Sequence, residues 1–307
     1  MAIAHLITHS GGFHADELLS TAILSRLFPD AELKRTRDKS WLTPADDRII
    51  YDVGGAYDAS AQIFDHHQRP GPARENEQPY SSFGLIWLHY GKLYLKELGV
   101  PDAHLDEIHE AFDDKFVLPV DLLDNGAIDP SVAGPLTALS LPTLLGALKP
   151  VFDDVSPTAE DDAFAQALPI ARSFVEGVIR NMAAKRRAHG LVMDAIAKAG
   201  SSPILELPVG MPFISALEEA GADHILFMVT PRGSDWTLNG IKLSADTFDQ
   251  RADLPAAWAG LSDSALEQAC GVKGAKFCHA ARFIAVANSR EAIMEMAEIA
   301  VREAQKA

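Results

Sequence analysis

The sequence predicts an α/β protein in which a doubly wound, mainly parallel sheet forms the N-terminal domain and a smaller α+β domain follows. Two short apolar segments, 2–8 and 48–53, each run into polar and glycine residues, as strands buried in a parallel sheet do. Residues 18–28 carry apolar side chains at helical spacing and stop before Pro29. A strand, a polar loop and a helix in that order are typical of this class.

The domain boundary is predicted at Ser201-Ser202-Pro203, which separates domain 1–200 from domain 203–307. The span 159–199 before it is expected to form one or two helices, and 290–305 a final helix. Further helices are expected at 82–98, 102–117 and 139–148. Strand-like runs after the boundary are 204–207, 225–229, 236–241 and 283–287.

Residues that commonly bind metals follow the first strand. His9, His14 and Asp16 lie on the predicted strand-to-helix loop, around the pair Gly11-Gly12. In open α/β sheets, ligands bind at the carboxyl ends of strands. Each histidine alone would more often be a hydrogen-bonded loop residue, so the site depends on other ligands converging on it.

Two aspartates have the same predicted placement. Asp52 closes the strand 48–53, and Asp124 ends a further strand candidate at 120–126; both precede a glycine turn. An Asp before Gly is by itself most often a turn former. Asp121 competes with Asp124 for the same role.

The run Asp65-His66-His67 supplies three more such side chains behind the apolar pair Ile63-Phe64. Alternation along an extended segment lets neighbouring side chains face different partners. A set of carboxylates and imidazoles without cysteine suits Mn²⁺ or Mg²⁺, with Zn²⁺ possible. The number of ligands exceeds the need of one ion, which favours two ions about 3.5–4 Å apart acting on a phosphoester.

These motifs, in this order, resemble the DHH phosphoesterase superfamily. Within it, the chain closely resembles the melanocyte-proliferating-gene (Myg) family of predicted metal-dependent hydrolases. The matching segments are THSGGFHADE (8–17), RTRD (35–38), YDVGG (51–55), FDHHQR (64–69), SSFGLIWLHYG (81–91), LLDNGAID (122–129), LPAAWAGL (254–261) and GVKGAKFCHAARFIAVANSRE (271–291). The resemblance covers nearly the whole chain.

The resemblance implies specific roles. His9, His14 and Asp52 would hold one metal, whereas Asp16, His66 and Asp124 would hold the second, with Asp52 shared. Asp65 would ligate or orient a neighbouring histidine, and His67 would face the substrate phosphate. The wider superfamily usually has an aspartate where His14 stands, and this difference should shift the metal preference towards softer ions.

The C-terminal segment 274–283 resembles the superfamily's glycine-rich substrate loop. Lys276, His279 and Arg282 would contact the substrate phosphate there. Arg282 stands where glycine is common, and an arginine can bind phosphate oxygens bidentately. Without the resemblance, Arg282 would be interpreted as a surface residue and His279 as a satisfied polar side chain.

Composition restricts the partners. The chain has 307 residues, is 48% hydrophobic and has a formal net charge of −16, which opposes binding of long duplex nucleic acid. It has no long apolar run for a membrane and no signal peptide. Its two cysteines, Cys270 and Cys278, suit a reducing cytoplasm. The oligomeric state does not follow from the sequence.

The resemblance implies a divalent-metal-dependent phosphodiester hydrolase, a 3′–5′ exonuclease on RNA or short oligonucleotides that uses a two-metal-activated water. Short single-stranded RNA or a nucleotide is the expected substrate, and two Mn²⁺ ions are the expected cofactor. Two alternatives stay open: a phosphohydrolase of small nucleotides or pyrophosphate, and a metal-binding regulatory protein with little hydrolytic activity.

Overall fold

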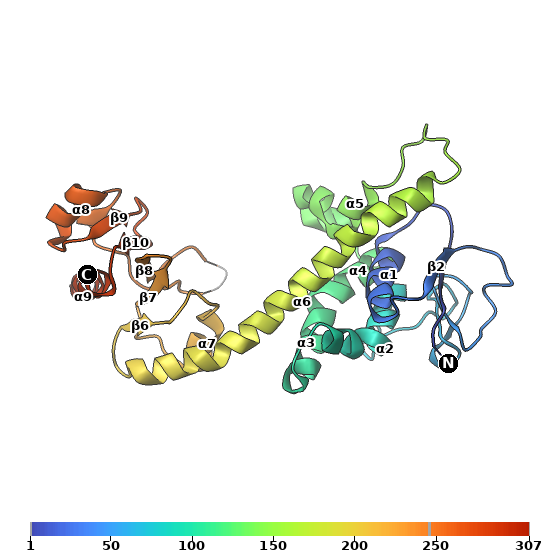
Figure 1. The fold of residues 1–307 in the computed structure, drawn as a ribbon, viewed down its shortest axis with the longest axis horizontal. Coiled ribbons are helices and arrows are strands. Elements are labelled where there is room, and N and C mark those ends of the chain that lie inside the picture. Colours follow the sequence, from blue (N-terminus) through green and yellow to red (C-terminus); the bar gives the residue numbers. More distant parts are fainter. Residues whose placement is uncertain (1, 245–246, 307) are drawn as a thin grey trace. The chain divides into compact units, whose positions relative to one another are not determined.

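The computed structural model describes residues 2–244 and 247–306. The chain divides into two compact units, Met1–Ala183 and Ala184–Ala307, and each contains one five-stranded sheet (Figure 1). The boundary between the units falls inside the long helix α6 (Ala159–Ala199). The α/β class expected from the sequence is confirmed.

The first sheet is mainly parallel and has the strand order β2-β1-β3-β5-β4. β2 and β3 flank β1 on opposite sides, and all three run parallel. The chain therefore reverses its winding direction at β1, which creates a topological switch point at the carboxyl ends of β1 and β3. The strands are β1 (His5–Thr8), β2 (Glu32–Arg35), β3 (Arg48–Tyr51), β4 (Tyr57–Asp58) and β5 (Ile63–Phe64).

The two faces of this sheet are covered differently. Leu6 and Tyr51 pack with helices α1 (Ala15–Leu27) and α2 (Ser82–Glu97). Their neighbours Ile7 and Ile50 face the opposite side, where they form a small cluster with loop residues. Successive strand residues point to opposite faces of the sheet. Since neighbouring residues of these short strands are apolar, both faces of the sheet are apolar here, as in a sheet covered on both sides.

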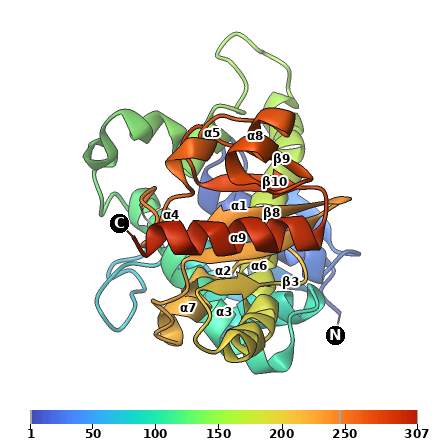
Figure 2. The same cartoon turned by 90° about the vertical axis from the view of Figure 1, so that its left-hand side faces the viewer.

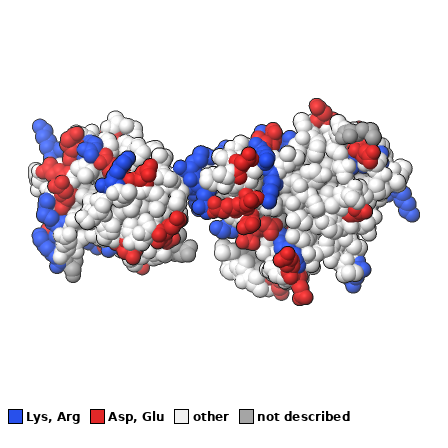
Figure 3. All heavy atoms as spheres, turned by 90° about the horizontal axis from the view of Figure 1, so that it is seen from below, with Lys and Arg blue, Asp and Glu red and all other residues white. Residues whose placement is uncertain are grey.

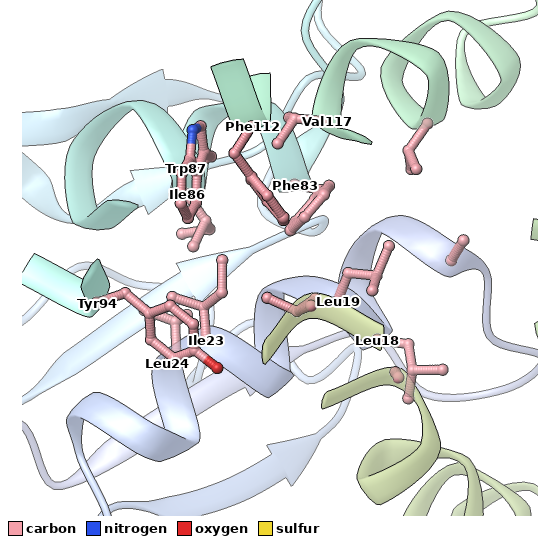
Figure 4. Close-up of a cluster of buried hydrophobic side chains, with 14 of the residues drawn as sticks. Leu18, Leu19, Ile23, Leu24, Phe83, Ile86, Trp87, Tyr94, Phe112 and Val117 are labelled. Atoms are coloured by element: carbon pink, nitrogen blue, oxygen red, sulfur yellow. The ribbon is translucent and has the colours of Figure 1, made fainter. Parts of the chain in front are cut away.

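Helices α1 and α2 form the main core of the first unit. Figure 4 shows side chains of α1, including Ile23 and Leu24, opposite Phe83, Ile86 and Trp87 of α2. All five are fully buried. Full burial of an aliphatic or aromatic side chain of this size contributes about 1.5–3 kcal/mol to the stability of the fold. The packing of these two helices therefore helps to hold strands β1 and β3 in place.

The expectation of a strand at 120–126 is wrong. Helix α3 (Leu105–Phe112) continues through a π-helical turn at 113–117 into helix α4 (Leu118–Asp124). Val117, Val120 and Asp121 are buried, a spacing of three and four residues that presents one helix face to the core. Asp124 thus ends a helix rather than a strand.

The remainder of the first unit connects α4 to α6. A 3₁₀ segment at Pro130–Leu139 leads into the short helix α5 (Leu141–Gly146). Helix α6 then forms a single helix of 41 residues, with Phe164, Ala167 and Val175 in the core. None of the helices formed by the described residues is both long and apolar enough to cross a membrane.

The second unit has the strand order β6-β7-β8-β10-β9, in which only β6 and β7 pair in parallel. Helix α9 covers one face of this sheet (Figure 2), where Ile293 and Met296 pack with Phe227 and Leu238. Its elements are β6 (Ile204–Glu206), α7 (Ile214–Glu219), β7 (Phe227–Arg232), β8 (Asp235–Gly240), α8 (Asp263–Cys270), β9 (Ala275–Cys278), β10 (Ile284–Ala287) and α9 (Arg290–Ala304).

Candidate metal centre

A cluster of carboxylates and imidazoles lies at the switch point of the first sheet. His9 follows β1, Asp52 follows β3 and Asp65 follows β5 directly. Because parallel strands end at the same sheet edge, residues that are far apart in sequence meet there. Helix α1 adds Asp16 from its first turn, and Asp124 comes from the end of α4.

Asp52 stands between two histidines. Its Oδ2 lies 3.1 Å from His9 Nε2, and its Oδ1 lies 3.4 Å from His66 Nε2. Burial opposes ionisation of Asp52, but the hydrogen bonds from His66 and His9 outweigh burial and lower its pKa to about 2. Its backbone has φ of 53°, a left-handed conformation that Asp and Asn tolerate better than most residues.

Glu17 belongs to this cluster, although nothing in the sequence singles it out. It is fully buried, and its Oε1 lies 3.1 Å from His9 Nε2. Both of its carboxylate oxygens also accept the backbone N–H of His14, so Glu17 caps helix α1. Acidic residues are common in a first helical turn whether or not they bind a ligand, so this position carries no distinguishing signal.

His9 is held between the two carboxylates. Burial would lower its pKa, but hydrogen bonds and charges from Asp52 and Glu17 prevail and raise the pKa to about 10. The exposed residue His14 lies nearby, with its ring centroid 6.2 Å from that of His9. The carboxylates therefore create a field that favours positive charge at His9.

Asp16 is the most unusual member. It is 1% exposed, and neither of its oxygens receives a hydrogen bond from a donor group of the described residues. Burial, followed by the charges of Asp52 and Asp124, raises its pKa well above the usual range. A buried carboxylate without a donor is costly, and a cation between these groups would remove that cost.

His66 completes the group around Asp16. Its Nε2 lies 3.3 Å from Asp124 Oδ2 and 3.8 Å from Asp16 Oδ2. Its Nδ1 donates to the side-chain oxygen of Asn125 at 3.2 Å, which leaves Nε2 directed at the carboxylates. Such an outer hydrogen bond fixes the ring of a metal-binding histidine.

Asp65 and His67 form a separate pair at the edge of the cluster. Asp65 Oδ1 lies 2.6 Å from His67 Nδ1, while its Oδ2 accepts the backbone N–H of Gly55 at 2.6 Å. Asp65 is buried, whereas the His67 side chain is 61% exposed. The carboxylate thus orients an imidazole whose other nitrogen is available.

Asp121 lies outside the cluster. Its carboxylate accepts hydrogen bonds from the Ser81 hydroxyl and the Gly84 backbone N–H, and it lies 2.8 Å from an Arg74 nitrogen. Burial raises its pKa to about 6. Of the two aspartates considered from the sequence, only Asp124 is placed beside Asp16 and His66.

The three residues expected to bind substrate lie in the second unit, whereas the cluster belongs to the first. Lys276 pairs with Asp235 at 2.7 Å, and Arg282 pairs with Asp253 at 2.6 Å. The Nδ1 of His279 accepts the backbone N–H of Ala281 at 3.0 Å. Both cations are therefore already matched by acidic neighbours.

The donor set fits divalent cations. Oxygen and imidazole donors of this cluster suit Mn²⁺ and Mg²⁺ as well as Zn²⁺, and the unmatched oxygens of Asp16 provide a position for positive charge. The potential metal ligands form four overlapping groups, and within each group the ligand atoms lie within 4.8 Å of one another. They are His9–His14–Glu17, Asp52–His66–His67, Asp16–His66–Asp124 and Asp16–Glu17–Asp52.

The family model MYG1_exonuc, described as "Uncharacterised protein family (UPF0160)", matches residues 5–301. The chain belongs to this family. The resemblance stated from the motifs is thereby confirmed over almost the full length. Membership of a family whose model is named for exonucleases identifies the protein as a hydrolase, and the cluster above offers donor groups suited to divalent metal ions.

Curated members of the MYG1 family resemble the chain over most of their length. MYG1 exonuclease of Homo sapiens is 33% identical over an alignment 326 positions long, which covers 97% of this chain and 85% of the human protein. MYG1 exonuclease of Mus musculus is 31% identical, with coverage of 97% and 84%. The MYG1 protein C694.04c of Schizosaccharomyces pombe is also 31% identical, with coverage of 97% and 98%.

A solved structure described as exonuclease RecJ bound to manganese matches more distantly. It is 14% identical with a TM-score of 0.29, and the match covers 97% of this chain and 90% of that one. A score of this size does not establish a shared fold, so the family assignment rests on the sequence relatives.

Proposed function

We propose that the protein is a phosphodiester hydrolase that removes nucleotides from the 3′ end of RNA or of short oligonucleotides with the help of two divalent metal ions. The observation that carries the proposal is Asp16, a buried carboxyl group that accepts no hydrogen bond from the described residues and is set among other potential ligands at the switch point. The human and mouse relatives are named exonucleases, which supports a nucleic acid substrate.

Two sets of residues would hold the ions. His9, His14 and Asp52 would form one set, with Glu17 beside it; Asp16, His66 and Asp124 would form the other, and Asp52 would be shared. Mn²⁺ is the proposed native ion. Bound divalent ions would supply Lewis-acid activation of water and neutralise phosphate charge.

The chain itself contributes orientation and proton handling. Asp65 holds the Nδ1 of His67, whose side chain is 61% exposed at the edge of the cluster. There His67 would donate a hydrogen bond to a phosphate oxygen, whose charge increases during displacement. Lys276, His279 and Arg282 of the second unit would bind further phosphate groups, in place of the present partners of the two cations.

Replacing His67 with Gln is expected to lower kcat by about 10²-fold while the ions stay bound, because His67 would act on the substrate. Asp65→Asn should have a smaller effect in the same direction, since it weakens the orientation of His67. Steady-state kinetics combined with metal analysis of each variant checks this. His104→Gln, outside the cluster, serves as the matched control, and loss of metal in His67→Gln would contradict the role.

A direct test of the proposed function combines elemental analysis with hydrolysis assays. Purified protein should contain close to two equivalents of divalent metal and should shorten end-labelled RNA of graded length, with Mn²⁺ giving higher activity than Mg²⁺ or Zn²⁺. A metal-loaded sample that cleaves neither RNA nor an activated phosphodiester would favour a regulatory metal-binding protein.

Hydrolysis of small nucleotides is the second candidate. It is favoured by a cavity of about 860 Å³ beside the cluster, lined entirely by residues of the first unit, a size ordinary for small-molecule sites. An enzyme of this kind should ignore RNA longer than a few nucleotides.

Charge and cysteine content support two further parts of the proposal, the kind of nucleic acid substrate and the cellular compartment. On the face shown in Figure 3, acidic and basic side chains are intermixed, and the net charge of −16 disfavours a long duplex substrate. Cys270 and Cys278 are free thiols, which suits the cytoplasm as the proposed compartment.

A further inference from the structure

The motif Arg35-Thr36-Arg37-Asp38 begins with the last residue of β2, at the sheet edge that carries the cluster. Its two arginines differ in environment. Arg35 is 4% exposed at its side chain, pairs with Asp161 at 2.6 Å and donates to the backbone oxygen of Gly11. Arg35 therefore fixes the loop that bears His9 and His14.

Arg37 is exposed, and its Nε donates a hydrogen bond to the backbone oxygen of Ser10 at 3.3 Å. Among the residues that the structure describes, no carboxylate lies within 4.0 Å of its guanidinium. A guanidinium tethered through Nε presents its two terminal nitrogens as a fork, the geometry that binds phosphate bidentately.

The environment of Arg37 points to its ligand. It lines a cavity of about 310 Å³, called here the small cleft, together with His14, Asp52, Gly54 and His67. His14, Asp52 and His67 also line the cavity of about 860 Å³. Residues of the cluster thus line both cavities. A phosphodiester bound at the cluster could direct one of its two nucleoside substituents into each cavity.

The small cleft has room for more than one phosphate group. At about 30 Å³ per water molecule in the liquid, 310 Å³ corresponds to roughly ten waters. The metal ions of the proposed function would neutralise the scissile phosphate. An unpaired arginine in the adjoining cleft is then suited to a second anion of the same ligand.

We infer that Arg37 binds a second, non-scissile phosphate, one linkage away from the phosphate at the cluster. The ligand class is an oligonucleotide with at least two phosphate groups, and this inference rests on the proposed function. It gives the first unit a phosphate contact of its own, in addition to the proposed contacts of Lys276 and Arg282.

The test compares a trinucleotide of RNA, which has two phosphodiesters, with bis(p-nitrophenyl) phosphate, which has one. Arg37→Gln is expected to raise KM for the trinucleotide about ten-fold with little change in kcat, and to leave kcat/KM for the one-phosphate substrate within twofold. Arg37→Lys should be intermediate because it keeps the charge without the fork. Lys39→Gln removes the same charge two residues away and should change neither.

Binding provides a second readout that does not depend on turnover. The Kd of a 5′-fluorescein-labelled trinucleotide with hydrolysis-resistant linkages, measured by fluorescence anisotropy on the metal-loaded protein, should rise about ten-fold in Arg37→Gln and remain unchanged in Lys39→Gln. Two results for Arg37→Gln would overturn the inference: an equal loss of kcat/KM on both substrates, or no change in the KM and Kd of the trinucleotide. A wild-type protein that hydrolyses neither substrate would instead refute the proposed function, while anisotropy would still report on Arg37.

Discussion

Asp52→Asn is expected to reduce phosphodiester hydrolysis by at least about 10³-fold while the protein stays folded. Asp52 lies between His9 and His66, and the amide of Asn would remove the negative charge that two metal ions would share. Asn tolerates the left-handed backbone at φ of 53°, so the loss should not come from misfolding. Hydrolysis assays with added Mn²⁺, together with circular dichroism, measure both properties.

The matched control is Asp106→Asn. Asp106 is an exposed carboxylate that pairs with Lys92 at 2.8 Å, outside the cluster. Its removal should leave the rate within twofold and the metal content unchanged. Substantial activity in Asp52→Asn with Mn²⁺ present would refute the shared role of Asp52.

The second large effect is expected for Gly84→Ala, which should destabilise the first unit by about 3 kcal/mol or more. A Cβ at this position would overlap Asp121 Oδ2 and would lie 2.7 Å from Tyr80 Cδ1. The Asp121 carboxylate cannot move away freely, because Ser81 and Arg74 hold it. For a unit of this size, such a loss lowers Tm by roughly 6–12 °C, which thermal denaturation followed by circular dichroism would detect.

Gly177→Ala provides the comparison. Gly177 also lies within a helix, but apart from its chain neighbours and the backbone of its own helix, no atom of the described residues lies within 4 Å of a Cβ built there. The higher helix propensity of alanine should then stabilise the protein by about 0.5–1 kcal/mol. Similar changes in Tm for Gly84→Ala and Gly177→Ala would show that close packing at Asp121 is not what requires glycine at 84.

The N-terminal architecture could be predicted because its signals are local. Short apolar strands ending in polar loops indicate a parallel sheet, and parallel strands end at one edge. The sequence pattern alone therefore places His9, Asp52 and Asp65 near one another. In the structure Asp52 lies 3.1 Å from His9, and His67 Nδ1 lies 2.6 Å from Asp65 and 3.7 Å from Asp52.

Helix α4 shows where local patterns fail. Two aspartates and a glycine after apolar residues resemble the end of a strand, but the preceding helix continues into this segment. The choice is decided by burial of Val117 and Val120 against the core, which is a tertiary effect. Periodicity over so few residues cannot separate the two structures.

The pairing of charged residues was equally hidden from the sequence. Arg74 pairs with Asp121, and Lys276 pairs with Asp235, which lies 41 positions before it. Such ion pairs depend on how loops and sheets bring distant segments together. These pairs distinguish cations that already have an acidic partner from Arg37, which pairs with no carboxylate in the part of the chain that the structure describes.

The unmatched oxygens of Asp16 link metal supply to the lifetime of the protein. A folded state with a buried carboxylate that receives no hydrogen bond from the described residues is less stable without a cation. An ion that binds only the folded state stabilises it in proportion to the logarithm of its concentration. Proteases and chaperones act on the unfolded fraction. We therefore expect metal depletion to shorten the half-life of this protein in the cell, so that its abundance, and not only its turnover rate, follows the available metal.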